Sequence, residues 1–451
     1  MNQAKTIKVV VALLAALIVL TISTSSTQTP LAKRVDNTPL ASVLPVNVIW
    51  ANTYGGAADD RAFYAVPTGD GFLVVGSTRS IAANTTVGWA LRLNSEGNAV
   101  WNKTFLEGFG IEIRCALNLT DGFLLVGNEF FASGAINGYV ARIDDLGNLL
   151  WRTILSSAET DKLFSGIAVQ DGFVVFGLAS SSLNGPSSAL AVKLDLDGSE
   201  LWNKTYGQIS ESALRSSVLS EDGDYVAAGY MDKGDSNYDF YLLKIAPNGN
   251  LIWNKTYGGA ESRKAYSMTK APDGYVLVGE VNSPTTSTDA WVIKVDENGN
   301  TLWNQTVGGK EADSPAYVTS TEDGGYLVAG FTFSFEVGNR DFWLFRISDQ
   351  GQVQFSCTQG DAGYQEAYGV IITGSNSYVM VGWTDPIGQP ALIGKATYDF
   401  YVVKVSVVQS NNGVSSFQFI DYTVTIVAVL TVTSLLMFKL RPKEKKNAQR
   451  S

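Results

Sequence analysis

The chain contains no histidine and only two cysteines among its 451 residues. Without histidine, the Ser-His and Cys-His nucleophile pairs are excluded, and so are most zinc sites. The two cysteines, Cys115 and Cys357, are too few for a disulfide scaffold. We expect them on strands too far apart to form a bond, and therefore as free thiols.

Positive charge is scarce in the middle of the chain. The ends outside 45–409 hold ten of the 33 basic residues and three of the 43 acidic ones, which leaves 23 basic and 40 acidic residues inside, a net charge of −17. A surface with this balance does not attract the phosphates of nucleic acids. We therefore expect no nucleic-acid partner, while cations and other proteins remain open.

The N-terminal segment resembles a signal peptide. Lys5 and Lys8 flank the start of a mostly apolar run, Val9–Ile22, which is short for a membrane span. We predict a signal peptide over 1–26, followed by a linker over 27–44. An uncleaved N-terminal anchor is the alternative.

The C-terminal segment predicts a single membrane anchor. The segment 421–440, within which Tyr422–Phe438 carries no charge, follows the polar linker 410–420 and precedes the basic tail 441–451. Basic residues after an apolar span place that side in the cytoplasm. We expect a transmembrane helix with a short cytoplasmic tail and residues 45–409 outside the cell. A buried core helix is the alternative.

Between these ends the chain repeats itself about every 51 residues. The first repeated feature is an aromatic residue, usually tryptophan. The second is an aromatic residue followed four positions later by glycine, and it recurs with the same spacing. Repeats of this length are typical of solenoids and propellers. The aromatic motif occurs at Trp50, Trp101, Trp151, Trp202, Trp253, Trp303 and Phe355, and the glycines are Gly76, Gly127, Gly177, Gly229, Gly279, Gly330 and Gly382.

Each repeat predicts four short strands. In 265–306, strands over 265–271, 275–281, 289–295 and 301–306 alternate with tight turns and one polar loop. Four antiparallel strands per repeat are the blade of a propeller. The glycine in the second strand predicts a place where two backbones approach closely.

The two ends of the repeat array predict how the ring closes. The first copy has only its aromatic strand, within 46–56, and the last copy, which ends at 399–408, lacks that strand. We therefore predict an all-β, seven-bladed propeller over 45–409 whose N-terminal strand completes the last blade, which removes an open sheet edge. An open β-solenoid is the alternative.

The turns "LDLDGSELW", "VDENGNTLW" and "IDDLGNLLW" resemble the repeat of pyrroloquinoline-quinone (PQQ)-like propellers. The Gly-to-Trp spacing agrees, whereas the Asp-to-Gly spacing is one residue shorter and the leading alanine is absent. The resemblance implies a propeller of the prokaryotic cell surface. Members of that family often use adjacent cysteines and Ca²⁺ with the quinone; this chain has no such cysteine pair, so we expect no PQQ.

A basic residue stands nine positions before the aromatic motif. One interpretation is a positive ring. The other, which we favour, is that each basic stem covers apolar surface and pairs with a carboxylate. These residues are Arg92, Arg142, Lys193, Lys244, Lys294 and Arg346, with Lys404 in the split blade.

The links between repeats carry acidic residues. Loops on a rigid scaffold are where binding usually occurs, and a ring of carboxylates is a candidate site for a ligand or for Ca²⁺. Interleaved arginines and lysines favour mutual ion pairing instead. The candidate ligand-face residues are Asp60, Glu112, Asp161, Glu211, Glu261, Asp313 and Glu366.

Six N-x-S/T sequons make glycosylation a further expectation for an extracellular chain. Four of them directly follow the aromatic motif, so repeat duplication accounts for their number. The candidates are Asn84, Asn102, Asn118, Asn203, Asn254 and Asn304.

Two functions remain open. The first is a monomeric, membrane-anchored binding or scaffold module for a surface polymer, a cation or an envelope protein. The second is a propeller enzyme, either glycosidase-like or quinoprotein-like. A glycosidase needs an organised pair of carboxylates, and no pair breaks the regularity of the repeat. We favour the binding module and assign no catalytic residue.

Overall fold

The computed structural model describes residues 44–82, 85–106, 108–182, 185–207, 211–234, 236–282, 287–335, 339–360, 363–385 and 397–408. These residues form 28 β-strands and no helix, so none of them belongs to a helix that could cross a membrane. The predicted signal peptide, 1–26, and the predicted transmembrane helix, 421–440, lie outside the described residues.

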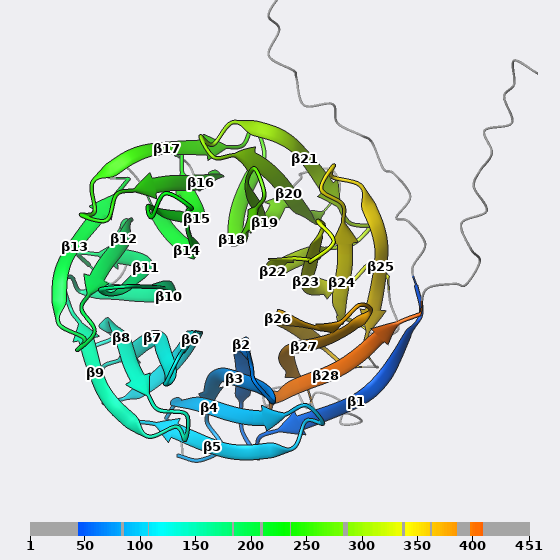
Figure 1. Cartoon of the computed structure of the whole chain (residues 1–451), viewed down its shortest axis with the longest axis horizontal. Helices are drawn as coiled ribbons and strands as arrows, with labels where there is room; N and C mark the ends of the chain where they lie inside the picture. The colour runs from blue at the N-terminus through cyan, green and yellow to red at the C-terminus, as the bar shows by residue number, and fades with distance from the viewer. Residues whose placement is uncertain are drawn as a thin grey trace, which may run out of the picture. The chain divides into compact units, whose positions relative to one another are not determined.

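The strands fall into groups of four, each with an inner, a second, a third and an outer strand (Figure 1). Six groups are consecutive in the chain, and the seventh combines the last three strands with the first one. The inner strands are β2 (Asp60–Thr68), β6 (Gly110–Leu119), β10 (Thr160–Val169), β14 (Ser212–Leu219), β18 (Ser262–Ala271), β22 (Asp313–Ser320) and β26 (Gln365–Gly374). The second strands are β3 (Gly71–Thr78), β7 (Gly122–Phe130), β11 (Gly172–Ser180), β15 (Tyr225–Asp232), β19 (Gly274–Asn282), β23 (Tyr326–Thr332) and β27 (Ser377–Thr384).

The other two positions complete each group. The third strands are β4 (Val87–Asn94), β8 (Ile136–Ile143), β12 (Ser187–Leu194), β16 (Tyr238–Ile245), β20 (Thr288–Asp296), β24 (Asp341–Ile347) and β28 (Asp399–Val407). The outer strands are β1 (Val46–Tyr54), β5 (Ala99–Phe105), β9 (Leu149–Leu155), β13 (Glu200–Tyr206), β17 (Leu251–Tyr257), β21 (Thr301–Val307) and β25 (Val353–Gln359).

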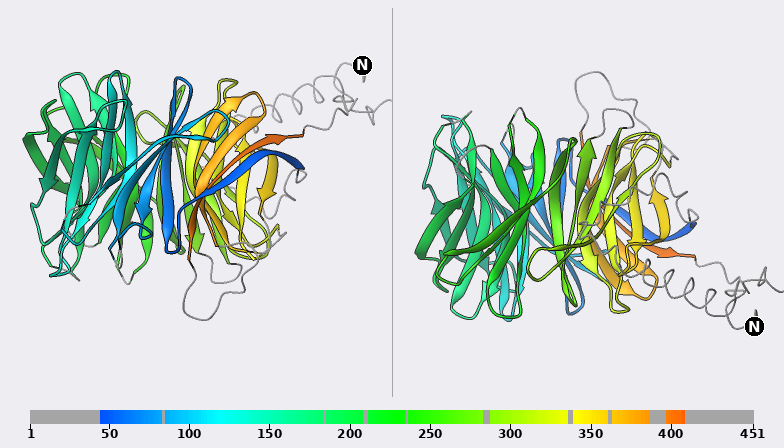
Figure 2. Two further views of the ribbon diagram at one scale, coloured as in Figure 1. Left: turned by 90° about the horizontal axis from the view of Figure 1, so that it is seen from below. Right: turned by 90° about the horizontal axis from the view of Figure 1, so that it is seen from above.

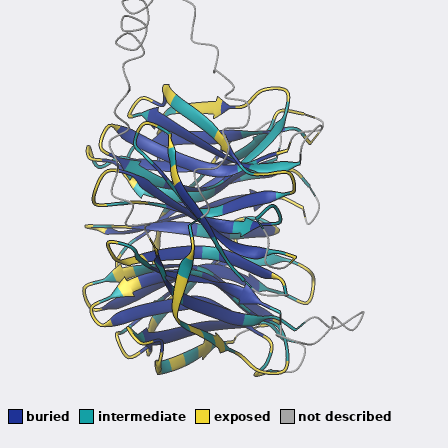
Figure 3. Cartoon of the chain, turned by 90° about the vertical axis from the view of Figure 1, so that its right-hand side faces the viewer, coloured by how far each residue is buried: buried dark blue, intermediate teal, exposed yellow. Residues whose placement is uncertain are grey.

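The groups stand around a central axis as a β-propeller, with loops gathered on two faces (Figure 2). Five sheets have four strands, and one has eight because a single parallel bridge, Thr160 to Ile136, joins the groups of β6–β9 and β10–β13. The core lies between neighbouring sheets, where Leu91 of β4 packs with Val379 and Val402. Exposed residues concentrate in the loops and outer strands (Figure 3).

The N-terminal strand closes the ring as predicted. β1 pairs antiparallel with β28 from Val46↔Val407 to Tyr54↔Phe400, which gives the sheet order β1-β28-β27-β26. Trp50 and Tyr54 of β1 also pack against the core shared with the β2–β5 sheet. The last sheet therefore takes its outer strand from the beginning of the described chain.

The aromatic motif and its glycine connect each sheet to the next. The Trp202 indole donates to the Pro247 carbonyl at 3.2 Å, in the turn between the third and outer strands of the following group. Gly249 of that turn has φ +79°, and a Cβ there would lie against the Trp202 ring. The same indole-to-turn hydrogen bond is made by Trp50, Trp101, Trp151 and Trp303. The repeat thus conserves a contact between sheets.

The glycine of the second strand lies opposite a β-bulge. The predicted close approach of backbones is confirmed at every copy: a Cβ on Gly279 would stand closer than 3.0 Å to the carbonyl oxygen of Lys264 on β18. The inner strand is irregular there, between Ala265 and Ser267. Glycine is needed because the bulge brings the inner backbone over the second strand.

The basic residue of the third strand pairs with a carboxylate, as we favoured. Lys294 is 2% exposed, and its Nζ lies 2.7 Å from Asp273 and 2.6 Å from Asp349. In six of the seven copies the partner is an aspartate in the turn between the inner and second strands; the corresponding turn beside Lys404, 375–376, has no acidic residue. The pairs are Arg92–Asp70, Arg142–Asp121, Lys193–Asp171, Lys244–Asp222, Lys294–Asp273 and Arg346–Asp323.

Both cysteines are free, as the sequence predicted, and the structure shows that both are buried. Burial raises the pKa of the Cys115 and Cys357 thiols to about 12. A thiol must ionise and be reached by the reagent in order to react. We therefore expect neither cysteine to be alkylated by iodoacetamide at pH 8 in the folded protein, and both to be alkylated in guanidinium chloride, as read by intact mass. Native labelling of either residue would contradict its burial.

Candidate binding site in the central channel

Every inner strand turns one bulged residue toward the central channel. The bulge lies three or four residues after the start of the inner strand, and it changes the direction of that side chain. The bulged residues all line one cavity of about 520 Å³. They are Phe63, Arg114, Phe164, Arg215, Tyr266, Ala316 and Tyr368.

The residue after the bulge forms a second layer of the lining. It is small in most strands and a tyrosine in two, Tyr64 and Tyr317, whose rings meet edge to face at 5.6 Å. Burial raises the pKa of both phenols above the ordinary value, so they stay neutral. This layer is polar but uncharged, and the charges of the cavity come from elsewhere.

Arg215 is the central charge of the cavity. Its guanidinium carbon lies 4.0 Å from the centroid of the Phe164 ring and 5.9 Å from that of Tyr266. Across the described residues it makes no ion pair or hydrogen bond. Burial, and then the charge of Arg114, lowers the pKa of Arg215 from its ordinary value. An arginine nevertheless keeps its proton in proteins, so a cation without a counter-charge faces the cavity.

Arg114 repeats this stacking one strand away. Its guanidinium lies 4.1 Å from the Phe63 ring centroid and pairs with Glu112. Phe63 in turn meets Tyr368 edge to face at 5.7 Å. Arginines and rings therefore alternate around one part of the channel, and each guanidinium lies over an aromatic ring.

Glu280 is the one acidic residue among those lining the cavity. Burial, and then the negative charge of Glu280, raises the pKa of the Tyr266 hydroxyl well above its ordinary value. Glu280 interacts with the Tyr266 hydroxyl and forms no ion pair with Arg215 among the described residues. The lining holds two arginines against one glutamate in a chain whose net charge is −10.

The acidic candidates of the sequence divide into two kinds. The glutamates are held by neighbouring polar groups: Glu112 by Arg114, Glu261 by Arg263 at 2.9 Å, and Glu366 by Arg340. Glu211 accepts a hydrogen bond from the Tyr238 hydroxyl at 2.7 Å. These four are ion-paired or hydrogen-bonded at the rim, as the interleaved basic residues suggested.

The aspartates Asp60, Asp161 and Asp313 are fully buried. The sequence placed them in links, whereas the structure places them in the first residues of β2, β10 and β22, because the inner strands begin earlier than predicted. Each accepts the backbone N–H of the residue four positions before it, as Gly56 donates to Asp60 at 2.8 Å. They order the links and do not form a ring open to solvent.

The sequons differ in accessibility. Asn102, Asn118, Asn203 and Asn254 are exposed on the outside of the sheets or in a strand end. Asn304 is half-buried, and its side-chain oxygen accepts a hydrogen bond from the Trp291 indole at 3.4 Å. Asn84 lies outside the described residues.

The bulged position was missed by sequence reasoning. The repeats were recognised from residues that stay constant, whereas this position carries Phe, Arg, Phe, Arg, Tyr, Ala and Tyr in turn. Its signal is variation at a fixed place, about 13 residues before the strand glycine. Unlike residues at one place are what a binding site needs.

No protein-family model and no curated protein sequence matches the chain. Solved structures that resemble it include the Pan2 WD40 domain of Neurospora crassa (12% identity, 82% of this chain and 98% of that chain, TM-score 0.47) and YCF48 bound to D1 peptide (11%, 83% and 99%, 0.47). A mutant Trypanosoma rangeli sialidase displaying trans-sialidase activity also matches (9%, 81% and 59%, 0.41). At these identities the likeness concerns fold alone.

Proposed function

We propose that the chain is a binding module that takes an anionic group of its ligand into the central channel. The observation that carries this proposal is Arg215, a stacked guanidinium that faces a cavity without an acceptor from the described chain. A charged donor in a low-dielectric cavity is costly until an anion pairs with it. A carboxylate of an acidic surface polymer or of an envelope protein meets that requirement.

The aromatic walls add a preference for rings. Phe63, Phe164 and Tyr368 line the cavity beside the two arginines, which lie over one face of Phe63 and one face of Phe164. Sugar rings and planar groups pack on the remaining aromatic surface while their carboxylate reaches the guanidinium. An acidic polysaccharide is therefore the ligand class that fits the cavity best.

The test compares an acid with its ester on the same sugar backbone. We expect oligogalacturonate to bind the wild-type protein and to raise its unfolding temperature, and its methyl ester to do neither. Arg215→Gln should weaken oligogalacturonate binding roughly 10- to 100-fold, because hydrogen bonds to charged groups contribute about 1.5–3 kcal/mol. Titration calorimetry measures both constants.

Lys310→Gln is the matched control, since it removes one positive charge from an exposed link. It should bind oligogalacturonate as the wild type does. Sulfate serves as a second probe that needs no sugar recognition. If neither anion binds, or if Arg215→Gln binds both as tightly as Lys310→Gln does, the channel is not an anion site.

Hydrolysis of an acidic glycoside is the second candidate function. Tyr266 faces Glu280 beside Arg215, and a tyrosine serves as nucleophile in sialidases. Two features weigh against it. The raised pKa of Tyr266 disfavours the nucleophilic phenolate, and no second carboxylic acid is among the residues lining the cavity. Release of methylumbelliferone from acidic glycosides that is lost in Tyr266→Phe would favour the enzyme over the binding module.

We further propose seven blades, a PQQ-like repeat without the cofactor, and an extracellular propeller on a C-terminal anchor. The eight-stranded sheet counts as two blades because a single bridge joins its halves. The missing cysteine pair supports the absence of PQQ, and the apolar run within 421–440 supports the anchor. Protease protection of the basic tail 441–451 in sealed vesicles tests the orientation.

A further inference from the structure

Four groups begin their third strand with an aspartate that meets the inner strand of the next group. We call each such meeting place a junction. The aspartates are Asp239, Asp289, Asp341 and Asp399. The residues that face them, each three positions before a bulge, are in the same order Arg263, Asp313, Gln365 and Asp60. The same aspartate position therefore faces three kinds of partner, which are arginine, glutamine and, at two junctions, a second aspartate.

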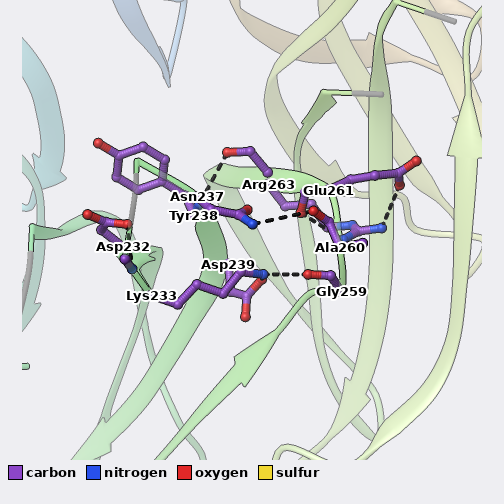
Figure 4. Close-up of polar contacts among 11 residues, drawn as sticks. Asp232, Lys233, Asn237, Tyr238, Asp239, Gly259, Ala260, Glu261 and Arg263 are labelled. Carbon is purple, nitrogen blue, oxygen red and sulfur yellow. Dashed lines mark hydrogen bonds and ion pairs between the residues drawn. The ribbon is translucent and has the colours of Figure 1, made fainter. Parts of the chain in front are cut away.

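At the first junction the aspartate is neutralised by the protein. Arg263 faces Asp239, and Nζ of Lys233 lies 2.6 Å from the Asp239 carboxylate and 2.5 Å from the Gly259 carbonyl oxygen. Figure 4 shows the ammonium between these two oxygens. A cation bound by a carboxylate and a backbone carbonyl is thus part of this junction.

Two junctions place a second carboxylate where the first has an arginine. Gly308 lies between Asp289 and Asp313, and Gly55 lies between Asp399 and Asp60: a Cβ on either glycine would meet both carboxylates. The fold keeps glycine there, so backbone and carboxylate oxygens crowd together. Each pair brings two negative charges to one place.

The described protein meets the charges of these pairs only in part. Asp60 and Asp313 accept hydrogen bonds from backbone N–H and hydroxyl groups, but no lysine or arginine of the described residues forms an ion pair with either pair. Asp60 is fully buried, and its Oδ1 has no hydrogen-bond partner among the described residues; the same holds for the buried Oδ1 of Asp289. The loop that precedes Asp289 contains no lysine or arginine, whereas the loop that precedes Asp399 contains Lys395, which lies outside the described residues. Burial, and then the charge of the partner aspartate, raises the pKa of Asp289 and of Asp399 to about 6. Each pair therefore contains a buried carboxylate oxygen to which the described protein offers no hydrogen-bond donor.

We propose that each of these two carboxylate pairs binds one hard divalent cation of the Ca²⁺ type. Carboxylate oxygens are the ligands that Ca²⁺ prefers, and it accepts carbonyl and water oxygens to complete six to eight. Since no group of three acidic side chains gathers within the described ranges, each site supplies two carboxylates and leaves the other positions to carbonyls and water. The cation takes the role that Lys233 and Arg263 perform at the first junction.

The experiment is thermal unfolding of the full-length protein at pH 7.5 in CaCl₂ and in EDTA, with calcium titration for stoichiometry. We expect the midpoint to be several degrees higher in calcium and the stoichiometry to be two. Asp289→Asn and Asp399→Asn should each remove one site, and the double variant both. In EDTA the variants should be at least as stable as the wild type, because the repulsion within the pair is gone.

Asp239→Asn is the matched control, since its partners are Lys233 and Arg263. It should be destabilised equally in calcium and in EDTA. Equal midpoints of the wild type in calcium and EDTA would overturn the proposal. If stability in EDTA instead rises as the pH falls from 7.5 to 5, and calcium has no effect, the pairs share a proton. A raised folded-state pKa gives that sign, because the folded protein then binds the extra proton. The channel variant Arg215→Gln should leave calcium binding unchanged.

Discussion

Deleting residues 45–56 is expected to abolish the cooperative unfolding transition of the propeller. The deletion removes β1, the outer strand of the β26–β28 sheet, and so exposes the backbone edge of β28. It also removes Trp50, whose indole reaches the Ser95 carbonyl in the neighbouring sheet. One strand therefore supports two sheets, and its loss opens the ring on both sides. Circular dichroism and thermal melting of the truncated chain measure the effect.

A circular permutation provides the control for this deletion. Because Val46 pairs with Val407 at the end of β28, residues 45–56 can be joined after Val408 through a short turn. This chain has the same composition and should regain the transition of the intact protein. A truncated chain that melts like the intact one would show that β1 is dispensable and that ring closure does not hold the fold together.

Gly279→Ala is expected to destabilise the protein by about 3 kcal/mol or more, as overpacking does where nothing can yield. The added methyl group would meet the Lys264 carbonyl oxygen and the Ala265 Cα, both backbone atoms of β18. This clash could be relieved only by a shift of the bulge, and the bulge is what directs the Tyr266 side chain into the channel. We therefore expect oligogalacturonate binding to fall together with stability. Urea unfolding curves give the first quantity and calorimetry the second.

Gly69→Ala is the control for this substitution. Gly69 lies in the turn between β2 and β3, and a Cβ there would meet no atom within 4 Å. An exposed substitution of this kind changes stability by about 0.5 kcal/mol or less. If Gly279→Ala is as mild as Gly69→Ala, the approach of the two backbones is not what requires glycine in the second strand.

The sequence was sufficient to predict the features that every repeat needs. Trp202 and Gly249 recur at fixed spacing because each sheet makes the same contact with the next, and Gly279 recurs because each inner strand has the same bulge. The incomplete first and last copies revealed the closing strand for the same reason. A fold built from one repeated contact can be predicted from a single sequence.

The candidate site was not readable in this way. Arg215 and Phe164 stack on each other from neighbouring groups, 51 residues apart, and no rule within one repeat joins them. The junction of Asp289 with Asp313 likewise depends on which sheet follows which. The buried aspartates appeared to be exposed acids because the start of the inner strand could not be located to within three residues. Contacts between residues of neighbouring sheets can be predicted only when the order of the sheets around the ring is known.

The register of the closing strand has a mechanical consequence. Val46 and Val407 face each other at one end of the β1–β28 ladder, while Tyr54 and Phe400 face each other at the other end. A force that draws Val46 and Val407 apart loads the hydrogen bonds one after another and not all together. We therefore expect the hydrogen bonds between β1 and β28 to break in sequence, at low force, when the protein is pulled at these two residues. Its stability against heat or denaturant, in contrast, depends on all of its strands.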